Sequence, residues 1–218
     1  MIVSHLSHVD SRIPKELQET YSHLAGIALN TLRALDEWKI LFGASKEAVD
    51  LMNQTAPDFF MHHQNLLFDH IVLSVSRLTD DKRSGSRKNP QENLTLACLL
   101  DLEPTKYPKL HEDLCKRWTV IQARAKPIRL FRHKVIAHTS RVHRLLPSTE
   151  LTKGITLKSI KDLLNEINAY LVTFECSFTG VDTPLQCPAS FGDAADLLGY
   201  LRLAVDAEKK QNEGLRGR

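Results

Sequence analysis

The chain has 218 residues, of which 42% are hydrophobic and 25% are charged, and both fractions are ordinary for a globular protein. Its 29 basic and 26 acidic residues give a formal net charge of +3, which excludes a disordered, highly charged chain and argues against a broadly basic polyanion binder. No stretch approaches the roughly 18 apolar residues of a membrane-spanning helix, and no secretory leader is apparent. We therefore expect a soluble cytoplasmic protein that makes no membrane contact.

Helical periodicity dominates the first third of the sequence. Between residues 24 and 42 the apolar positions follow steps of four and three, which indicates one face of a long helix. Pro14 suits the first turn of this helix and Gly43 suits its end. A second helix, mostly apolar and expected to be well buried, is predicted from Pro57 to about Asp80.

The middle of the chain begins with a polar stretch. Residues 80–90 contain glycine and proline and have no periodicity, so they predict an exposed, mobile loop. A short helix is predicted near 94–100, followed by a longer one over about 110–125. Pro127 is expected to restart or kink this helix before it continues through 128–138.

The last third is again helical. After a loop over about 139–155, Thr156 is the predicted N-cap of a helix whose apolar face extends to Phe178. A final helix is expected around 194–208, and no segment has the alternation of a strand. The sequence thus predicts an all-α fold, a single-domain bundle of about six or seven helices. The expected boundaries are a flexible N-terminus at 1–13, a helical domain at 14–208 and a polar, frayed C-terminal tail at 209–218.

The small net charge conceals an uneven distribution. No acidic residue lies between Asp113 and Glu150, and the rest of the chain carries a net charge of −6. A concentrated basic segment attracts a phosphate backbone, but it is also compatible with a solvated helix face whose acids lie on neighbouring helices. The nine basic residues of this window are Lys116, Arg117, Arg124, Lys126, Arg129, Arg132, Lys134, Arg141 and Arg144.

The most informative segment lies inside this basic window. Phe131, Val135 and His138 are spaced by four and three, so they share one face of the predicted helix. Arg132 precedes His138 by six residues, or about 9 Å along a helix axis. Both side chains can therefore reach one cleft if the end of this helix faces another element.

A second polar feature runs along the mostly apolar helix predicted at 57–80. His63, His70, Ser74 and Arg77 follow steps of seven, four and three, and Asp80 continues the series. Buried polar groups need hydrogen-bond partners, so this polar seam is a candidate lining for the same cleft.

The Arg132-x(5)-His138 spacing resembles the R-x(4–6)-H motif of the HEPN superfamily. Its context, Phe-Arg-His-Lys-Val-Ile-Ala-His-Thr, is similar to the abortive-infection, AbiU-like branch of that superfamily. The upstream segment Leu73–Asp80, the polar loop after it and Asn93–Leu96 are similar to the same branch.

Over residues 14–208 the resemblance implies a helical HEPN fold, commonly a homodimer, and often a metal-independent endoribonuclease of phage-defence or toxin–antitoxin systems. It implies that Arg132 and His138 occupy the catalytic motif positions, with His133 at the variable second position. The resemblance also implies a cognate antitoxin as a partner. Ser140 stands where toxins paired with nucleotidyltransferase antitoxins usually carry tyrosine, so adenylylation by such a partner is not expected.

These residue types suit cleavage of RNA through its own 2′-OH. A histidine that titrates near neutral pH transfers protons, and an arginine stabilises charge on the phosphate. His133 is a candidate second proton carrier, and DNA is excluded because it lacks the 2′-OH. No cofactor is expected, and no metal site, because the histidines of the 57–80 helix lack a recognised ligand spacing. The expected RNA-binding residues are Arg129, Lys134, Arg141 and Arg144.

Two other interpretations remain open at the level of sequence. One is a non-catalytic HEPN module that binds RNA or a nucleotide. The other is a structural helical interaction protein, in which His138 caps a helix C-terminus and Arg132 pairs with Asp80 or Asp81. In that case acids from other helices neutralise the basic window.

Overall fold

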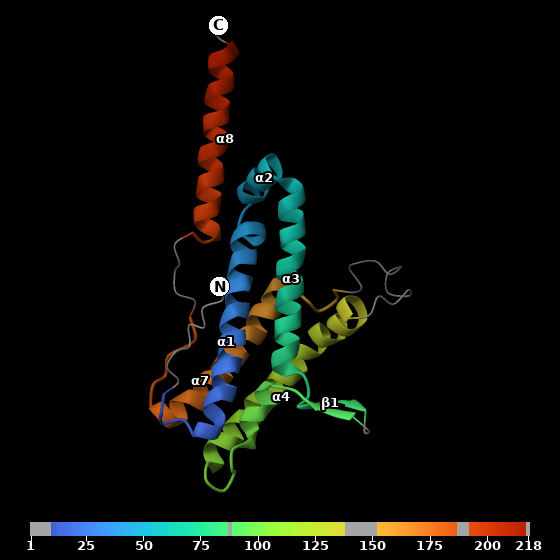
Figure 1. The fold of residues 1–218 in the computed structure, drawn as a ribbon, viewed down its shortest axis with the longest axis vertical. Coiled ribbons are helices and arrows are strands. Elements are labelled where there is room, and N and C mark those ends of the chain that lie inside the picture. Colours follow the sequence, from blue (N-terminus) through green and yellow to red (C-terminus); the bar gives the residue numbers. More distant parts are fainter. Residues whose placement is uncertain (1–9, 87–88, 138–151, 187–191, 217–218) are drawn as a thin grey trace. The chain divides into compact units, whose positions relative to one another are not determined.

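The computed structural model describes residues 10–86, 89–137, 152–186 and 192–216 (Figure 1). Within these residues the fold is all-α, as predicted, apart from one small two-stranded sheet. The chain divides into two compact units, one drawn from residues 1–32 and 71–186 and the other from 33–70 and 187–218. None of the described helices is long and apolar enough to cross a membrane.

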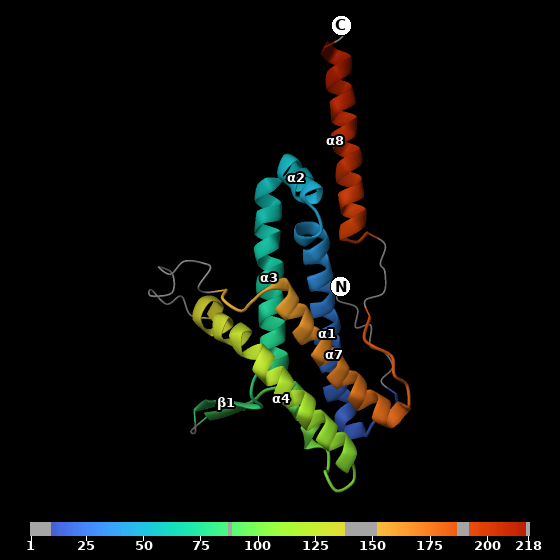
Figure 2. The same ribbon diagram turned by 180° about the vertical axis from the view of Figure 1, so that it is seen from behind.

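The long helices lie where the apolar periodicities predict them (Figures 1 and 2). Among the described α-helices, the periodicity did not predict α2, which begins where the Ser45 side chain accepts a hydrogen bond from the Ala48 amide at 3.1 Å. Its ten residues are too few for a clear periodic signal. The α-helices are α1 (Lys15–Trp38), α2 (Lys46–Thr55), α3 (Pro57–Thr79), α4 (Pro108–Phe131), α7 (Leu157–Thr179) and α8 (Ala194–Arg216).

Helix α4 continues through Pro127 without restarting there, and a kink at this residue stays a prediction. A proline inside a helix removes one amide donor, and packing of the flanking turns compensates for the loss: Ala125 and Ile128 are both buried. The helix changes character later, at Arg132–Ala137, which form the π-helical turn η3. The residues that follow η3, 138–151, lie outside the described part of the chain.

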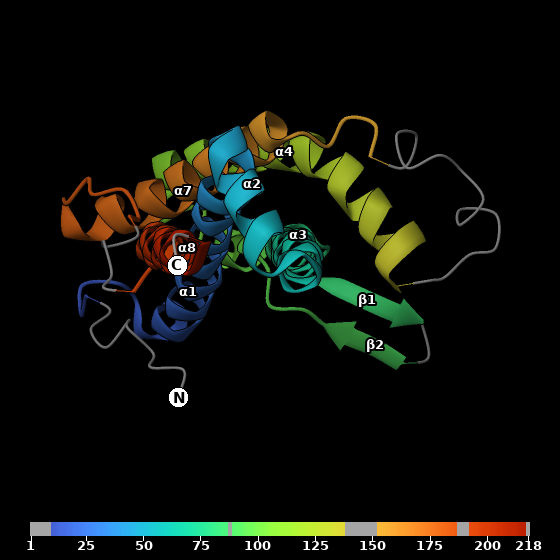
Figure 3. The same cartoon turned by 90° about the horizontal axis from the view of Figure 1, so that it is seen from above.

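Residues 80–90 are not simply a loop, because an antiparallel hairpin is formed by β1 (Arg83–Ser86) and β2 (Asn89–Glu92) (Figure 3). Gly85 adopts a φ of +86°, and a Cβ there would lie 2.5 Å from the Asn89 carbonyl oxygen, so the turn requires glycine. The sequence did not reveal these strands because their described side chains are exposed and polar, which leaves no alternation to detect.

The core of the first unit lies mainly between α4 and α7, and Tyr21 of α1 contacts Phe174 and Glu175 of α7. The Thr156 N-cap is confirmed, since its side chain accepts from the Ser159 amide at 3.0 Å. Phe174 is fully buried on the predicted apolar face of α7 and stacks on Tyr21 with ring centroids 5.4 Å apart. The steps of four and three along α7 therefore reflect one face buried against α4 and α1.

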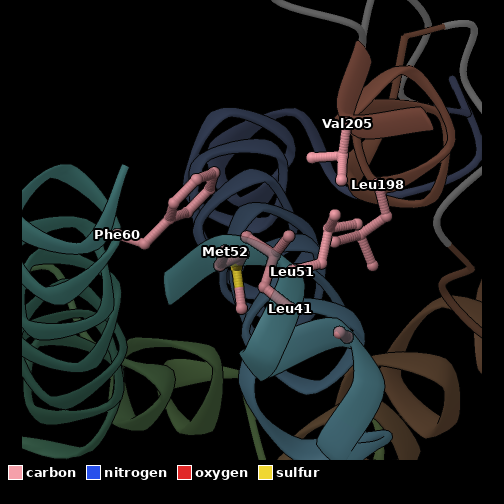
Figure 4. Close-up of a cluster of buried hydrophobic side chains, with 7 residues drawn as sticks. Leu41, Leu51, Met52, Phe60, Leu198 and Val205 are labelled. Carbon is pink, nitrogen blue, oxygen red and sulfur yellow. The ribbon is translucent and has the colours of Figure 1, made fainter. Parts of the chain in front are cut away.

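The second unit has a smaller core of its own (Figure 4). Leu198 and Val205 of α8 pack there against residues of α2, α3 and the π-helical turn Lys39–Gly43. Helix α8 continues to Arg216, eight residues beyond its predicted end, because its polar C-terminal part is rich in good helix formers. The other labelled members of this core are Leu41, Leu51, Met52 and Phe60.

Candidate functional site

In the first unit, the C-terminal end of α3 meets the junction of α4 and η3. Nη2 of Arg132 lies 2.8 Å from Oδ1 and 2.7 Å from Oδ2 of Asp80, so the guanidinium and the carboxylate form an ion pair between these elements. Of the two acids considered for this arginine, Asp80 is therefore its partner. The contact places the first residue of the predicted motif directly at the end of α3.

Thr79, the residue before Asp80, is also bonded to α4. The Thr79 carbonyl oxygen accepts hydrogen bonds from Gln122 Nε2 at 2.8 Å and from Arg129 Nη1 at 2.6 Å, both on α4. A carbonyl in the last turn of a helix has no intrahelical donor and lies at the negative end of the helix dipole, so an arginine is a favourable partner. Arg129, predicted to bind RNA, thus anchors α3 in this structure.

Arg132 is only partly satisfied by Asp80. Its side chain is 29% exposed, yet its Nε is buried and has no hydrogen-bond partner among the described residues. A buried N–H without an acceptor carries a desolvation cost that an incoming acceptor would relieve. The guanidinium is therefore held through Nη2 on one side, while part of the side chain stays exposed.

The remaining predicted residues of the motif region lie on η3 or beyond the described residues. On η3, His133 is exposed and Lys134 is half-buried. The predicted catalytic His138 lies outside the described residues, as do the predicted RNA contacts Arg141 and Arg144. Of the two motif residues, Arg132 and His138, the structure therefore describes Arg132.

The predicted polar seam does not form one continuous lining. Ser74 is buried, whereas His70 and Arg77 are exposed on the same side of α3. His63 belongs to the second unit, where it lies 2.8 Å from Glu37 and stacks on Phe59. Spacing along a helix places residues on one side, but the neighbouring elements decide which turns of that side are covered.

The expectation that α3 is well buried is also wrong for its first half. Phe59 is 63% exposed and Leu66 is 53% exposed. By contrast, Ile71, Val72 and Val75 in the second half are almost completely buried. Apolar content alone does not distinguish a covered helix from one with a free apolar side.

Acids on α4 and α7 form ion pairs with three basic residues at the start of the basic window. This agrees with the solvated-face alternative for these three residues. On α7, the pKa of Asp162 is lowered chiefly by a hydrogen bond from Lys158, with a smaller contribution from the Arg124 charge. The pairs are Lys116–Glu112 at 2.6 Å, Arg117–Glu166 at 3.4 Å and Arg124–Asp162 at 4.0 Å.

Comparison with known families gives a match over most of this chain. The AbiU2 family model of HEPN domains matches residues 14–175, which is well over half of the 218 residues. The chain belongs to the AbiU2 family of HEPN proteins. No curated protein and no solved structure matches it.

The AbiU2 match makes the chain an HEPN module related to abortive infection. The matched residues include both partners of the Arg132–Asp80 ion pair and the residues that hydrogen-bond at the Thr79 carbonyl. The match ends before α8 begins. Sequence reasoning missed Thr79 and Gln122 in the AbiU2 chain. A backbone carbonyl acceptor leaves no side-chain signature, and a single glutamine on α4 shows no pattern.

Replacing Arg129 with methionine in the AbiU2 chain is expected to lower the free energy of unfolding by about 1–2 kcal/mol. Methionine retains most of the apolar stem but cannot donate to the Thr79 carbonyl. Urea denaturation followed by circular dichroism measures the change. Lys126→Met is the matched control, because this exposed residue of α4 carries the same charge. Equal losses of unfolding free energy in the two variants would contradict a stabilising role for the Arg129–Thr79 hydrogen bond.

Proposed function

We propose that the chain is a metal-independent endoribonuclease of a phage-defence or toxin–antitoxin system. The observation that carries the proposal is the state of Arg132, which is anchored by Asp80 through Nη2 yet remains partly exposed, and which stands six residues before His138. An arginine in this state is preorganised for a phosphate, because little conformational freedom is lost when the anion binds.

In the proposed reaction, the ribose 2′-oxygen attacks the adjacent phosphorus and the bond to the 5′-oxygen breaks. The products are a 2′,3′-cyclic phosphate and a free 5′-OH. Arg132 stabilises the charge that develops on the phosphate oxygens, and Asp80 orients Arg132. His138 is the proposed general acid or base for one of the two proton transfers.

The second proton transfer needs another group. The proposal assigns it to His138 of a second copy in a homodimer, with His133 as the alternative within one chain. Lys134, Arg141 and Arg144 are the proposed contacts to the RNA backbone. Because Arg129 is bonded to Thr79, it contributes to RNA binding mainly through its charge. The proposed setting is the cytoplasm, with a cognate antitoxin as a further partner.

The Arg132–Asp80 pair also favours a second candidate function. The Asp80 carboxylate already pairs with the Arg132 guanidinium, and carboxylates of α4 and α7 pair with several basic residues of α4. A non-catalytic HEPN module that binds RNA or a nucleotide through the remaining donors has the same features. It would show salt-sensitive binding without turnover.

The purified chain is expected to cleave single-stranded RNA in the presence of EDTA and to leave 2′,3′-cyclic phosphate ends. The measurement is gel electrophoresis of end-labelled RNA, with mass spectrometry of the termini. A DNA oligonucleotide of the same sequence is the control and should stay intact, because it lacks the internal nucleophile. Cleavage that EDTA abolishes, or equal cleavage of the DNA, would refute this mechanism. Binding without cleavage would establish the second candidate in its place.

A further inference from the structure

Helix α8 has two apolar rows on different sides. One row, which includes Leu198 and Val205, is docked in the core of the second unit (Figure 4). The other row contains Leu197, Tyr200 and Leu203, of which the last two are each 69% exposed. Because successive residues turn by about 100° around a helix, the two rows lie about 150° apart.

The exposed row is unusual for the outer side of a surface helix. Such a side normally carries polar residues, and here the row continues toward the C-terminus with the exposed residues Ala204 and Ala207. Within the described residues nothing covers Tyr200 or Leu203. Contiguous exposed apolar residues at helical spacing are typical of a surface that pairs with another helix.

Charged residues beside the row indicate what covers it. Asp196 and Lys210 lie on the same edge of the row, seven residues before and seven residues after Leu203. In an antiparallel pair of identical helices centred on residue 203, each residue faces the one equally distant on the other side of the centre. Asp196 of one copy then faces Lys210 of the second copy, and the pair occurs twice.

We propose that the exposed row of α8 is an interface to a second copy of this chain, in which the two α8 helices pack antiparallel about Leu203. A parallel pair is disfavoured, because it would bring Asp196 level with Asp196 and Lys210 level with Lys210. The proposal goes beyond the proposed function by assigning the surface that joins two copies. It stands on residues outside the family match, which ends at residue 175.

The test is the oligomeric state of the full chain, measured by sedimentation equilibrium or light scattering at micromolar concentrations without RNA. The unsubstituted chain is expected to be a dimer. Lys210→Glu is expected to weaken the dimer about tenfold, because two attractive pairs become two repulsive ones. Lys209→Glu is the matched control: it makes the same charge change at the neighbouring exposed residue, which lies on the side of the helix opposite the exposed row, and it should leave the dimer unchanged.

Asp196→Lys is informative mainly in combination with Lys210→Glu. Asp196 also accepts a hydrogen bond from the Gly192 amide at 2.8 Å, so its single substitution disturbs the start of α8 as well. The double variant Asp196→Lys/Lys210→Glu is expected to recover most of the dimer affinity lost in Lys210→Glu. Recovery requires that the two residues face each other across the interface.

Leu203→Glu provides a second, stronger test. It places two carboxylates together at the centre of the interface and should produce a monomer, while an exposed position of this kind should not affect folding. An unsubstituted chain that is monomeric at these concentrations would overturn the proposal, even if it cleaves RNA or binds a different protein through α8. Equal behaviour of the Lys210 and Lys209 variants, or a dimer that survives Leu203→Glu, would also overturn it. These outcomes do not depend on whether the chain is a ribonuclease.

Discussion

Replacing His138 with alanine is expected to lower the rate of RNA cleavage in EDTA by about 10²–10⁴-fold, the usual effect of losing a general acid or base. The physical reason is that alanine cannot exchange a proton near neutral pH, whereas the binding groups around Arg132 stay in place. The measurement is the initial rate on a labelled RNA at saturating protein, together with RNA affinity from fluorescence anisotropy. Affinity should change much less than the rate.

Two further variants make this result specific. His62→Ala removes an exposed histidine of the second unit and should leave the rate unchanged. His133→Ala decides the origin of the second proton transfer: a large loss supports a site within one chain, and an unchanged rate supports two copies of His138 in a dimer. If the His138 variant is folded and cleaves at the normal rate, the proposed catalysis is wrong.

Replacing Arg132 has the second large expected effect. Arg132→Ala is expected to lower cleavage by about 10²–10³-fold, because a preorganised donor to the developing phosphate charge is lost. Arg132→Lys keeps the charge but not the planar donor geometry, so it should recover only part of the activity. Arg124→Ala is the matched control, because it removes an arginine of α4 that also lies beside a carboxylate, Asp162. Cleavage unaffected by Arg132→Ala in a folded protein would exclude this role.

The Arg132–Asp80 contact predicts a separate effect on stability. Arg132→Ala should lower the free energy of unfolding by about 1 kcal/mol, because both partners are partly exposed and the pair is screened by water. In the double variant with Asp80→Ala, the two losses should not add, because both substitutions remove the same contact. Denaturant unfolding thus separates the anchoring of α3 from the proposed binding of phosphate.

Local sequence was sufficient for much of the helical framework. The 3.6-residue period of α1 and α7 is present in the chain because each helix buries one face, and the Thr156 cap depends on residues only three positions apart. The motif that matches the HEPN pattern is equally local. These features could be predicted because their cause lies within one or two turns of backbone.

Other predictions failed where the cause lies elsewhere in the fold. The polar hairpin at 83–92 has no apolar face and therefore no periodic signal. The polar series on α3 falls on one side of the helix, yet Ser74 is buried and Arg77 is exposed. Exposure is a property of neighbouring elements, which spacing along one helix does not specify.

At the candidate site, some features follow from residue identity and others depend on tertiary packing. Residue identity alone established that Arg132 carries a permanent charge, that it precedes a histidine by six residues and that Asp80 and Asp81 were available to it. Tertiary structure selected Asp80, 52 residues away in the chain, and recruited the Thr79 carbonyl as a partner for Arg129. The physical reason is that an ion pair or a hydrogen bond requires a contact of about 3 Å, and only the packing of α3 against α4 brings residues this distant in sequence that close.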